Sequence, residues 1–195
     1  MVLALLALAT TLATPTGPAS GGPIDDPLRP LFPTADDMAG LVPSGNSHFS
    51  DDDLTDLYDG GAARFVKAGV TGASRRYYTL DGASAEIVIH RMTNAKAAED
   101  FLVVLCKDIR AKVESAVKAK ACVAASAGTS YGYLAAGPYL SFASFDKEDA
   151  RTVRALLELC SRRTSARGNL RKTSRQEYRA RRSAARLMHG FAVCV

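Results

Sequence analysis

Apolar and polar positions follow two different periods along this chain, and the changes of period mark the expected helices and strands. Apolar residues recur at helical spacing over 54–66. Ser50 and the three aspartates after it can cap a helix and favour its dipole, so a first helix is expected here. Gly60 and Gly61 interrupt the pattern, which predicts a kink or close packing against another backbone.

The next two segments predict a hairpin followed by a helix. Residues 70–80 and 83–92 form two candidate strands around Asp81-Gly82, a favoured two-residue turn. In the second strand Ile87 and Ile89 alternate with polar and apolar residues of the other face. Thr93 or Asn94 can cap a helix that the pattern extends over 95–120.

A second unit of the same kind is expected further along the chain. Residues 129–136 and 139–145 predict a hairpin around Gly137-Pro138, and 122–127 can form a further strand. Asp146 can cap a last helix over 147–163. The sequence therefore predicts an α+β fold, a two-layer sandwich with a mostly antiparallel sheet of about four strands. These come from two hairpin-plus-helix units, with an extra N-terminal helix.

The N-terminus predicts export. Val2–Ala13 is an uncharged apolar run, too short to span a bilayer and typical of a signal peptide, although no Lys or Arg precedes it. Small residues place the cleavage site after Ala13 or Ala19. A buried N-terminal strand or helix is the alternative. We expect a signal peptide over 1–19, a Pro/Gly-rich linker over 20–40, one domain over 41–162 and a basic, disordered tail over 163–195, in a secreted or periplasmic protein.

Composition adds charge asymmetry to this picture. The chain has 195 residues and a net charge of +5. Residues 161–195 contain ten basic residues and one acidic residue, a net charge of +9, which leaves −4 for the rest. An envelope partner or an anionic surface could therefore bind the C-terminal arginines, and no specific nucleic acid is predicted. The arginines of this hypothesis are Arg162, Arg163, Arg179, Arg181 and Arg182.

Four cysteines become candidates for a disulfide in an exported protein. If the helix over 95–120 is unbroken, Cys106 and Cys122 lie about 20 Å apart, beyond the reach of a disulfide. Cys106 and Cys160 occupy matching places in the two units, which favours their pairing, with two buried thiols as the alternative. No CxxC spacing occurs, so no metal site and no cofactor are predicted.

One stretch resembles a family of exported bacterial proteins that share a domain of unknown function. Its signature is a Leu-Tyr-x-Tyr-Ile-Asn-Gly-Ala-Ala helix followed by a hairpin, and the similarity covers about residues 43–162. Asp59 stands where the family has Asn, Gly61 where it has Ala and Leu57 where it has Tyr. The resemblance implies an envelope or secreted location and brings no catalytic residues. The matching positions are Leu54, Asp56, Leu57, Tyr58, Asp59, Gly60, Ala62, Phe65, Gly69, Val70, Tyr78, Ala83, Ser84, Ile87, Ile89, Met92, Ala98 and Phe101.

No catalytic constellation stands out, and the expected function is non-catalytic binding of a ligand or partner. The candidates for a site are Tyr58, Asp59 and His90, although an exposed strand histidine is the simpler interpretation of His90. An exported enzyme of unrecognised type would need a polar cleft around these three residues. Other tyrosines could line a ligand cleft or form ordinary cross-strand pairs. They are Tyr77, Tyr78, Tyr131, Tyr133 and Tyr139.

Overall fold

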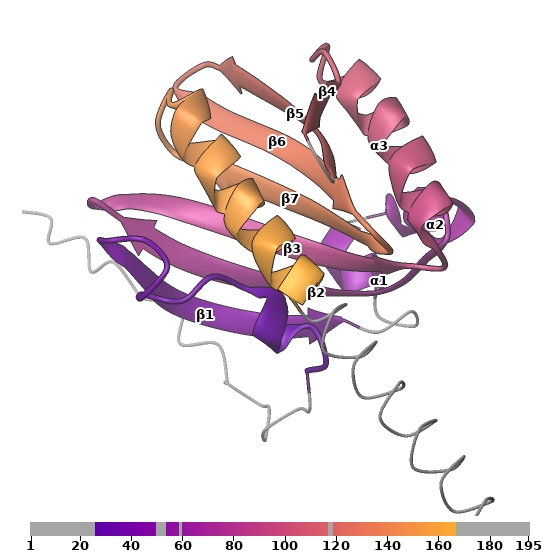
Figure 1. Ribbon diagram of the computed structural model, residues 1–195, viewed down its shortest axis with the longest axis horizontal. Coiled ribbons are helices and arrows are strands. Elements are labelled where there is room, and N and C mark those ends of the chain that lie inside the picture. Colours follow the sequence, from indigo (N-terminus) through magenta and orange to yellow (C-terminus); the bar gives the residue numbers. More distant parts are fainter. Residues whose placement is uncertain (1–25, 50–53, 59, 117–118, 167–195) are drawn as a thin grey trace, which may run out of the picture.

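A computed structural model describes residues 26–49, 54–58, 60–116 and 119–166, which form a mixed fold of helices around one antiparallel sheet (Figure 1). The sheet has seven strands in the order β1-β2-β3-β7-β6-β5-β4. The helices are a short 3-10 helix, three labelled α-helices and an unlabelled helix over 150–166. Their bounds are Arg29–Leu31, Leu54–Tyr58 (α1), Ala62–Lys67 (α2) and Ala95–Asp108 (α3). The strands are Leu41–Phe49 (β1), Val70–Leu80 (β2), Ala83–Met92 (β3), Glu114–Ala116 (β4), Ala119–Ser126 (β5), Thr129–Ala136 (β6) and Tyr139–Phe145 (β7).

The α+β class and both hairpin-plus-helix units are confirmed, but the expected four strands undercount the sheet. The β2–β3 turn uses Asp81 and Gly82 with φ of 48° and 74°, as its sequence predicts. The sequence missed β1 and β4. Pro43 and Gly45 weaken the strand signal of β1, which tolerates them because it is an edge strand with a bulge between these residues.

The expected two layers are wrong, because both faces of the sheet are covered. One core cluster joins Ile87 and Ile89 of β3 to the helix over 150–166. The other joins Val88 and Met92 of the same strand to α3. Since successive side chains of a strand point to opposite faces, the two clusters lie on opposite sides of the sheet.

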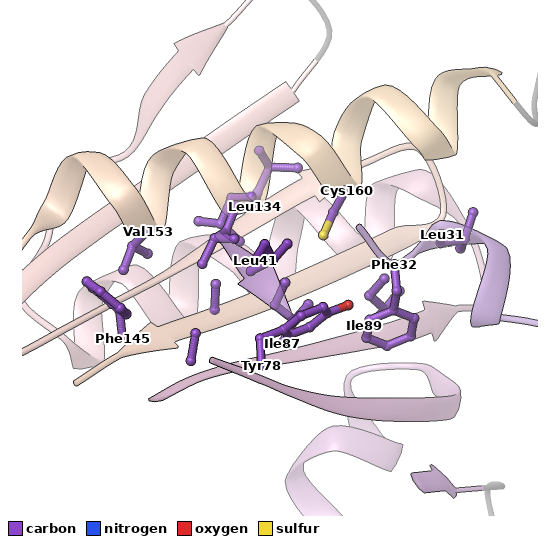
Figure 2. Close-up of a cluster of buried hydrophobic side chains, with 14 of the residues drawn as sticks. Leu31, Phe32, Leu41, Tyr78, Ile87, Ile89, Leu134, Phe145, Val153 and Cys160 are labelled. Carbon is purple, nitrogen blue, oxygen red and sulfur yellow. The ribbon is translucent and has the colours of Figure 1, made fainter. Parts of the chain in front are cut away.

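The expected linker over 20–40 is also wrong in its second half. Leu28, Leu31 and Phe32 are buried beside the helix over 150–166, as Figure 2 shows for the last two. The Tyr78 hydroxyl donates to the carbonyl of Pro33 at 3.0 Å, which fixes this segment to β2. Apolar side chains among the prolines therefore extend the domain to residue 26 at least.

Cys106 pairs with Cys122 and not with Cys160. The Cα atoms of Cys106 and Cys122 lie 5.9 Å apart, and Cys160 is a buried free thiol. The expected pair fails because Cys106 and Cys160 belong to core clusters on opposite faces of the sheet. The helix over 95–120 is shorter than expected: α3 ends at Asp108, and the chain turns at Arg110 with φ of 54°.

Two helix starts differ from expectation. The first helix is divided into α1 and α2 at Gly60, whose φ of 90° is incompatible with a continuous right-handed helix. The last helix begins after Asp149, whose carboxylate accepts from the amides of Arg151 and Thr152. Asp146 does not cap it, because its amide donates to Ser84 and so extends the sheet pairing. Of the two residues expected to cap α3, Asn94 is the one that does, because its side chain accepts from the amide of Ala97.

Candidate functional site

Part of one sheet face carries a row of polar and aromatic side chains. Tyr77 of β2 lies opposite Glu86 of β3, Glu86 opposite Ser144 of β7, and Ser144 opposite Tyr131 of β6. The cross-strand register therefore brings together four residues that are far apart in the sequence. Because paired residues share a face, all four side chains project to the same side.

A second row lies two residues along the strands, on the same face. Arg75 is opposite Val88, Val88 opposite Phe142, and Phe142 opposite Tyr133. The rings of Tyr133 and Phe142 lie 5.2 Å apart in a tilted pair. We call the two rows together the open face, made of Arg75, Tyr77, Glu86, Tyr131, Tyr133, Phe142 and Ser144.

The open face is accessible because the helices on this side cover the other end of the sheet. Figure 1 shows α1, α2 and α3 away from the β2–β3 turn. Tyr77 is 42% exposed, whereas Tyr78, which points to the opposite face, is 1% exposed. The other members of the open face are half-buried, with the side chains of Arg75 and Glu86 at 24% and 25% exposure.

An ion pair lies within the open face. Nε of Arg75 is 2.6 Å from Oε1 of Glu86. The same guanidinium donates to the Tyr77 hydroxyl at 3.0 Å and to the carbonyl of Leu57 at 3.3 Å. The pair holds Arg75 in place and cancels its charge, so the described residues of this face have no net charge.

The contact between Tyr58 and His90 lies beside the open face. The Tyr58 hydroxyl contacts Nε2 of His90, and Nδ1 of His90 is 2.9 Å from the carbonyl of Leu140. A carbonyl only accepts, so Nδ1 carries the proton and Nε2 accepts from the tyrosine. Burial lowers the pKa of His90 to about 4, which keeps the ring neutral at physiological pH.

Aromatic stacking fixes Tyr58 against the helices. Its ring stacks on Phe65 of α2 at 3.6 Å, and Phe65 meets the edge of Phe101 in α3 at 5.2 Å. Burial, together with the nearby Tyr133, raises the pKa of Tyr58. Tyr58 therefore lies at the border between the helix-covered part of this face and the open face.

Sequence reasoning found part of this arrangement. Tyr58 and His90 come together as candidates, and Asp59 lies outside the described residues. The expected exposure of His90 is wrong, because the residue is 1% exposed under α1 and α2. The tyrosines divide by face: Tyr77, Tyr131 and Tyr133 belong to the open face, while Tyr78 and Tyr139 pack in the opposite core.

Arg75, Phe142 and Ser144 were missed as site residues. The alternation of side chains along each strand indicates which of these residues share a sheet face within one hairpin. The pairing of β3 with β7, which joins the two hairpins into one row, has no local sequence signal.

The arginines expected to bind an anionic surface lie in different environments or outside the described residues. Arg162 is exposed on the last helix. Arg163 binds within the fold instead, with Nη2 2.5 Å from Asp37 and 3.1 Å from the Thr34 hydroxyl. Arg179, Arg181 and Arg182 lie outside the described residues.

The described part of the chain lacks two functional features, a metal-binding cluster and a membrane-spanning helix. It holds no group of three His, Cys, Asp or Glu side chains arranged for a metal ion. None of its helices is long and apolar enough to cross a bilayer.

No family model matches this sequence, and no curated protein matches it significantly. The resemblance to the exported bacterial family therefore stays a prediction.

Proposed function

We propose that this chain is an exported, non-catalytic domain that binds a ligand or partner through the open face. The observation that supports this most is the accessibility of its aromatic rows, in contrast to the buried reverse side of the same strands. Half-exposed tyrosines beside an arginine are typical of recognition surfaces, because their rings offer apolar area and their tips offer hydrogen bonds. The leader and the family resemblance support export.

The disulfide is consistent with an oxidising compartment. Cys106–Cys122 joins α3 to β5 beneath the half of the face that the helices cover. Stable disulfides are typical of secreted and periplasmic proteins and rare in the cytosol.

Native mass spectrometry tests the proposal on the full chain, produced with its leader in a bacterial host and recovered from the exported fraction. We expect a mature N-terminus near Thr14 or Ser20 and a disulfide that reductant removes. We also expect a co-purifying adduct that Tyr77→Ala and Tyr131→Ala both weaken. An uncleaved, reduced, adduct-free protein in the cytosol would contradict the proposal.

A matched control separates the open face from general damage to the fold. Tyr139→Ala removes a half-buried tyrosine from the opposite face of the sheet. This variant should keep the adduct. Loss of the adduct in all three variants would indicate a folding defect, which a thermal melt of each variant detects.

An exported enzyme is the second candidate, supported by the Tyr58–His90 contact. Against it, both ring nitrogens of His90 are engaged within the fold. In addition, the raised pKa of Tyr58 and the lowered pKa of His90 keep both groups neutral near pH 7. A hydrolytic activity of the purified protein that Tyr58→Phe abolishes would favour the enzyme.

A further inference from the structure

We infer that the ligand of the open face is a neutral oligosaccharide, an inference that rests on the proposed binding function. Three properties of the face lead to this class of ligand: its size, its charge and the kinds of group it presents.

The size of the face favours a small ligand over a folded protein. The row from Tyr77 to Tyr131 crosses four strands, which at ~4.8 Å per step is about 14 Å. The two rows lie two residues apart, about 7 Å along the strands, so the face covers on the order of 300 Å² with its side-chain margins. A stable protein interface needs about 800 Å² per partner, well above this area.

The charge of the face disfavours anionic ligands. Arg75 is its only cation among the described residues, and Glu86 binds that cation at 2.6 Å. Nucleic acids and sulfated glycans bind through several uncompensated cations. A neutral ligand requires none and leaves the ion pair intact.

The groups of the face match those of a sugar ring. Tyr77, Tyr131 and Tyr133 present partly exposed aromatic rings, which pack against the apolar C–H faces of pyranose rings. Glu86 supplies acceptors and Arg75 supplies donors for sugar hydroxyls. Thr79 and Ser84 are paired and exposed in the next row towards the β2–β3 turn, and their hydroxyl groups add further donors and acceptors.

Isothermal titration calorimetry of the full chain with chitohexaose and cellohexaose tests the inference. We expect at least one of them to bind, and Tyr77→Ala and Tyr131→Ala each to weaken its affinity by roughly tenfold. Tyr139→Ala, on the opposite face, should leave the affinity unchanged. Failure of both sugars to bind, or binding that neither open-face variant weakens, would overturn the inference.

A heparin hexasaccharide provides the anionic comparison. The basic residues of 161–195 can bind heparin on their own, so only heparin binding that Tyr77→Ala or Tyr131→Ala weakens concerns the open face. We expect this open-face binding to be weaker than that of the neutral sugars, and tighter open-face binding of heparin would also overturn the inference. The native mass spectrometry experiment distinguishes a failure of the saccharide inference from a failure of the proposed binding function. If neither sugar binds but an adduct still depends on Tyr77 and Tyr131, the saccharide is wrong and the binding function remains. If no adduct forms either, both are wrong.

Discussion

The hydroxyl of Tyr58, the last residue of α1, contacts Nε2 of His90, which lies in the middle of β3. The contact is the first of two consecutive hydrogen bonds, and the second joins Nδ1 of His90 to the carbonyl of Leu140 in β7. One short helix, whose continuation is interrupted at Gly60, is thus attached to two neighbouring strands of the sheet. Since Tyr58 also borders the open face, the same contact fixes one edge of the proposed binding surface.

Replacing Tyr58 with Phe should destabilise the protein by about 1–3 kcal/mol. The change keeps the stacking on Phe65 and removes only the hydroxyl, which leaves the buried Nε2 of His90 without its donor. Urea unfolding followed by circular dichroism measures the loss.

The control for this change is Tyr139→Phe. Among the described residues, the Tyr139 hydroxyl has no hydrogen-bond partner, so its removal should change stability by less than about 0.5 kcal/mol. Equal effects of the two variants would contradict a specific role for the Tyr58–His90 contact.

Stability should fall between about pH 6.5 and pH 4 because of His90. Its pKa is about 4 in the folded protein and about 6.5 in the unfolded chain, so the unfolded chain binds the proton first as the pH falls. The contribution of neutral His90 to the free energy of unfolding is complete above pH 6.5 and is lost as the pH approaches 4. The difference between the two pKa values corresponds to about 3 kcal/mol of this free energy.

Urea midpoints of the wild-type protein and of His90→Gln, measured at several pH values, check this expectation. The variant should lose most of the pH dependence in this range. Asp37 acts in the same direction at lower pH. Although desolvation opposes it, hydrogen bonds from Thr34 and Arg163 hold the pKa of Asp37 below its usual range. An unchanged slope in His90→Gln would assign the effect to other groups.

Local signals predicted the parts of the fold that depend on neighbouring residues. The Asp81-Gly82 turn, the Asn94 cap and both hairpins follow from short-range chemistry and are confirmed. The errors concern long-range packing. The strand pattern of β3 was read correctly, yet which helix covers which of its faces depends on the crossover between the two units.

The disulfide is a case in which the wrong placement of helices on the sheet led to a second wrong prediction. Similar places of Cys106 and Cys160 in the two units favoured their pairing, but the units place their helices on opposite faces of the sheet. The open face was missed in the same way. Its row exists only because β3 pairs with β7, which brings Glu86 beside Ser144.

Breaking the Cys106–Cys122 bond should cost about 3 kcal/mol. The bond joins residues 16 positions apart, and the chain-entropy estimate for a loop of this length is about 3 kcal/mol. Denaturant unfolding with and without reductant measures the difference, and the Cys106→Ala, Cys122→Ala double variant should reproduce the reduced protein. A reductant effect that persists in the double variant would refute this origin.

Cys160 should resist alkylation in the folded protein. Burial raises its pKa to about 12, so the reactive thiolate is scarce at pH 8 and the sulfur is inaccessible. Iodoacetamide labelling followed by peptide mass spectrometry should detect modification of Cys160 only after denaturation. Rapid labelling of the native protein at this residue would show that the last helix detaches from the sheet.

Replacing Gly132 with Ala should destabilise the protein by about 2–3 kcal/mol, the upper part of the range for overpacking, because β5 and β6 approach closely at this point. A methyl group there would lie 2.5 Å from the carbonyl oxygen of Cys122 and 3.2 Å from Cα of Val123. Both are backbone atoms of a paired strand, so they cannot move without disturbing the pairing next to the disulfide. Gly128→Ala in the β5–β6 turn is the control for lost glycine freedom alone. Its methyl group would meet nothing within 4 Å, and its φ of 81° costs about 1 kcal/mol in strain. Thermal melts compare the two variants, and a Gly132→Ala protein as stable as Gly128→Ala would show that β5 can shift to accommodate the methyl group.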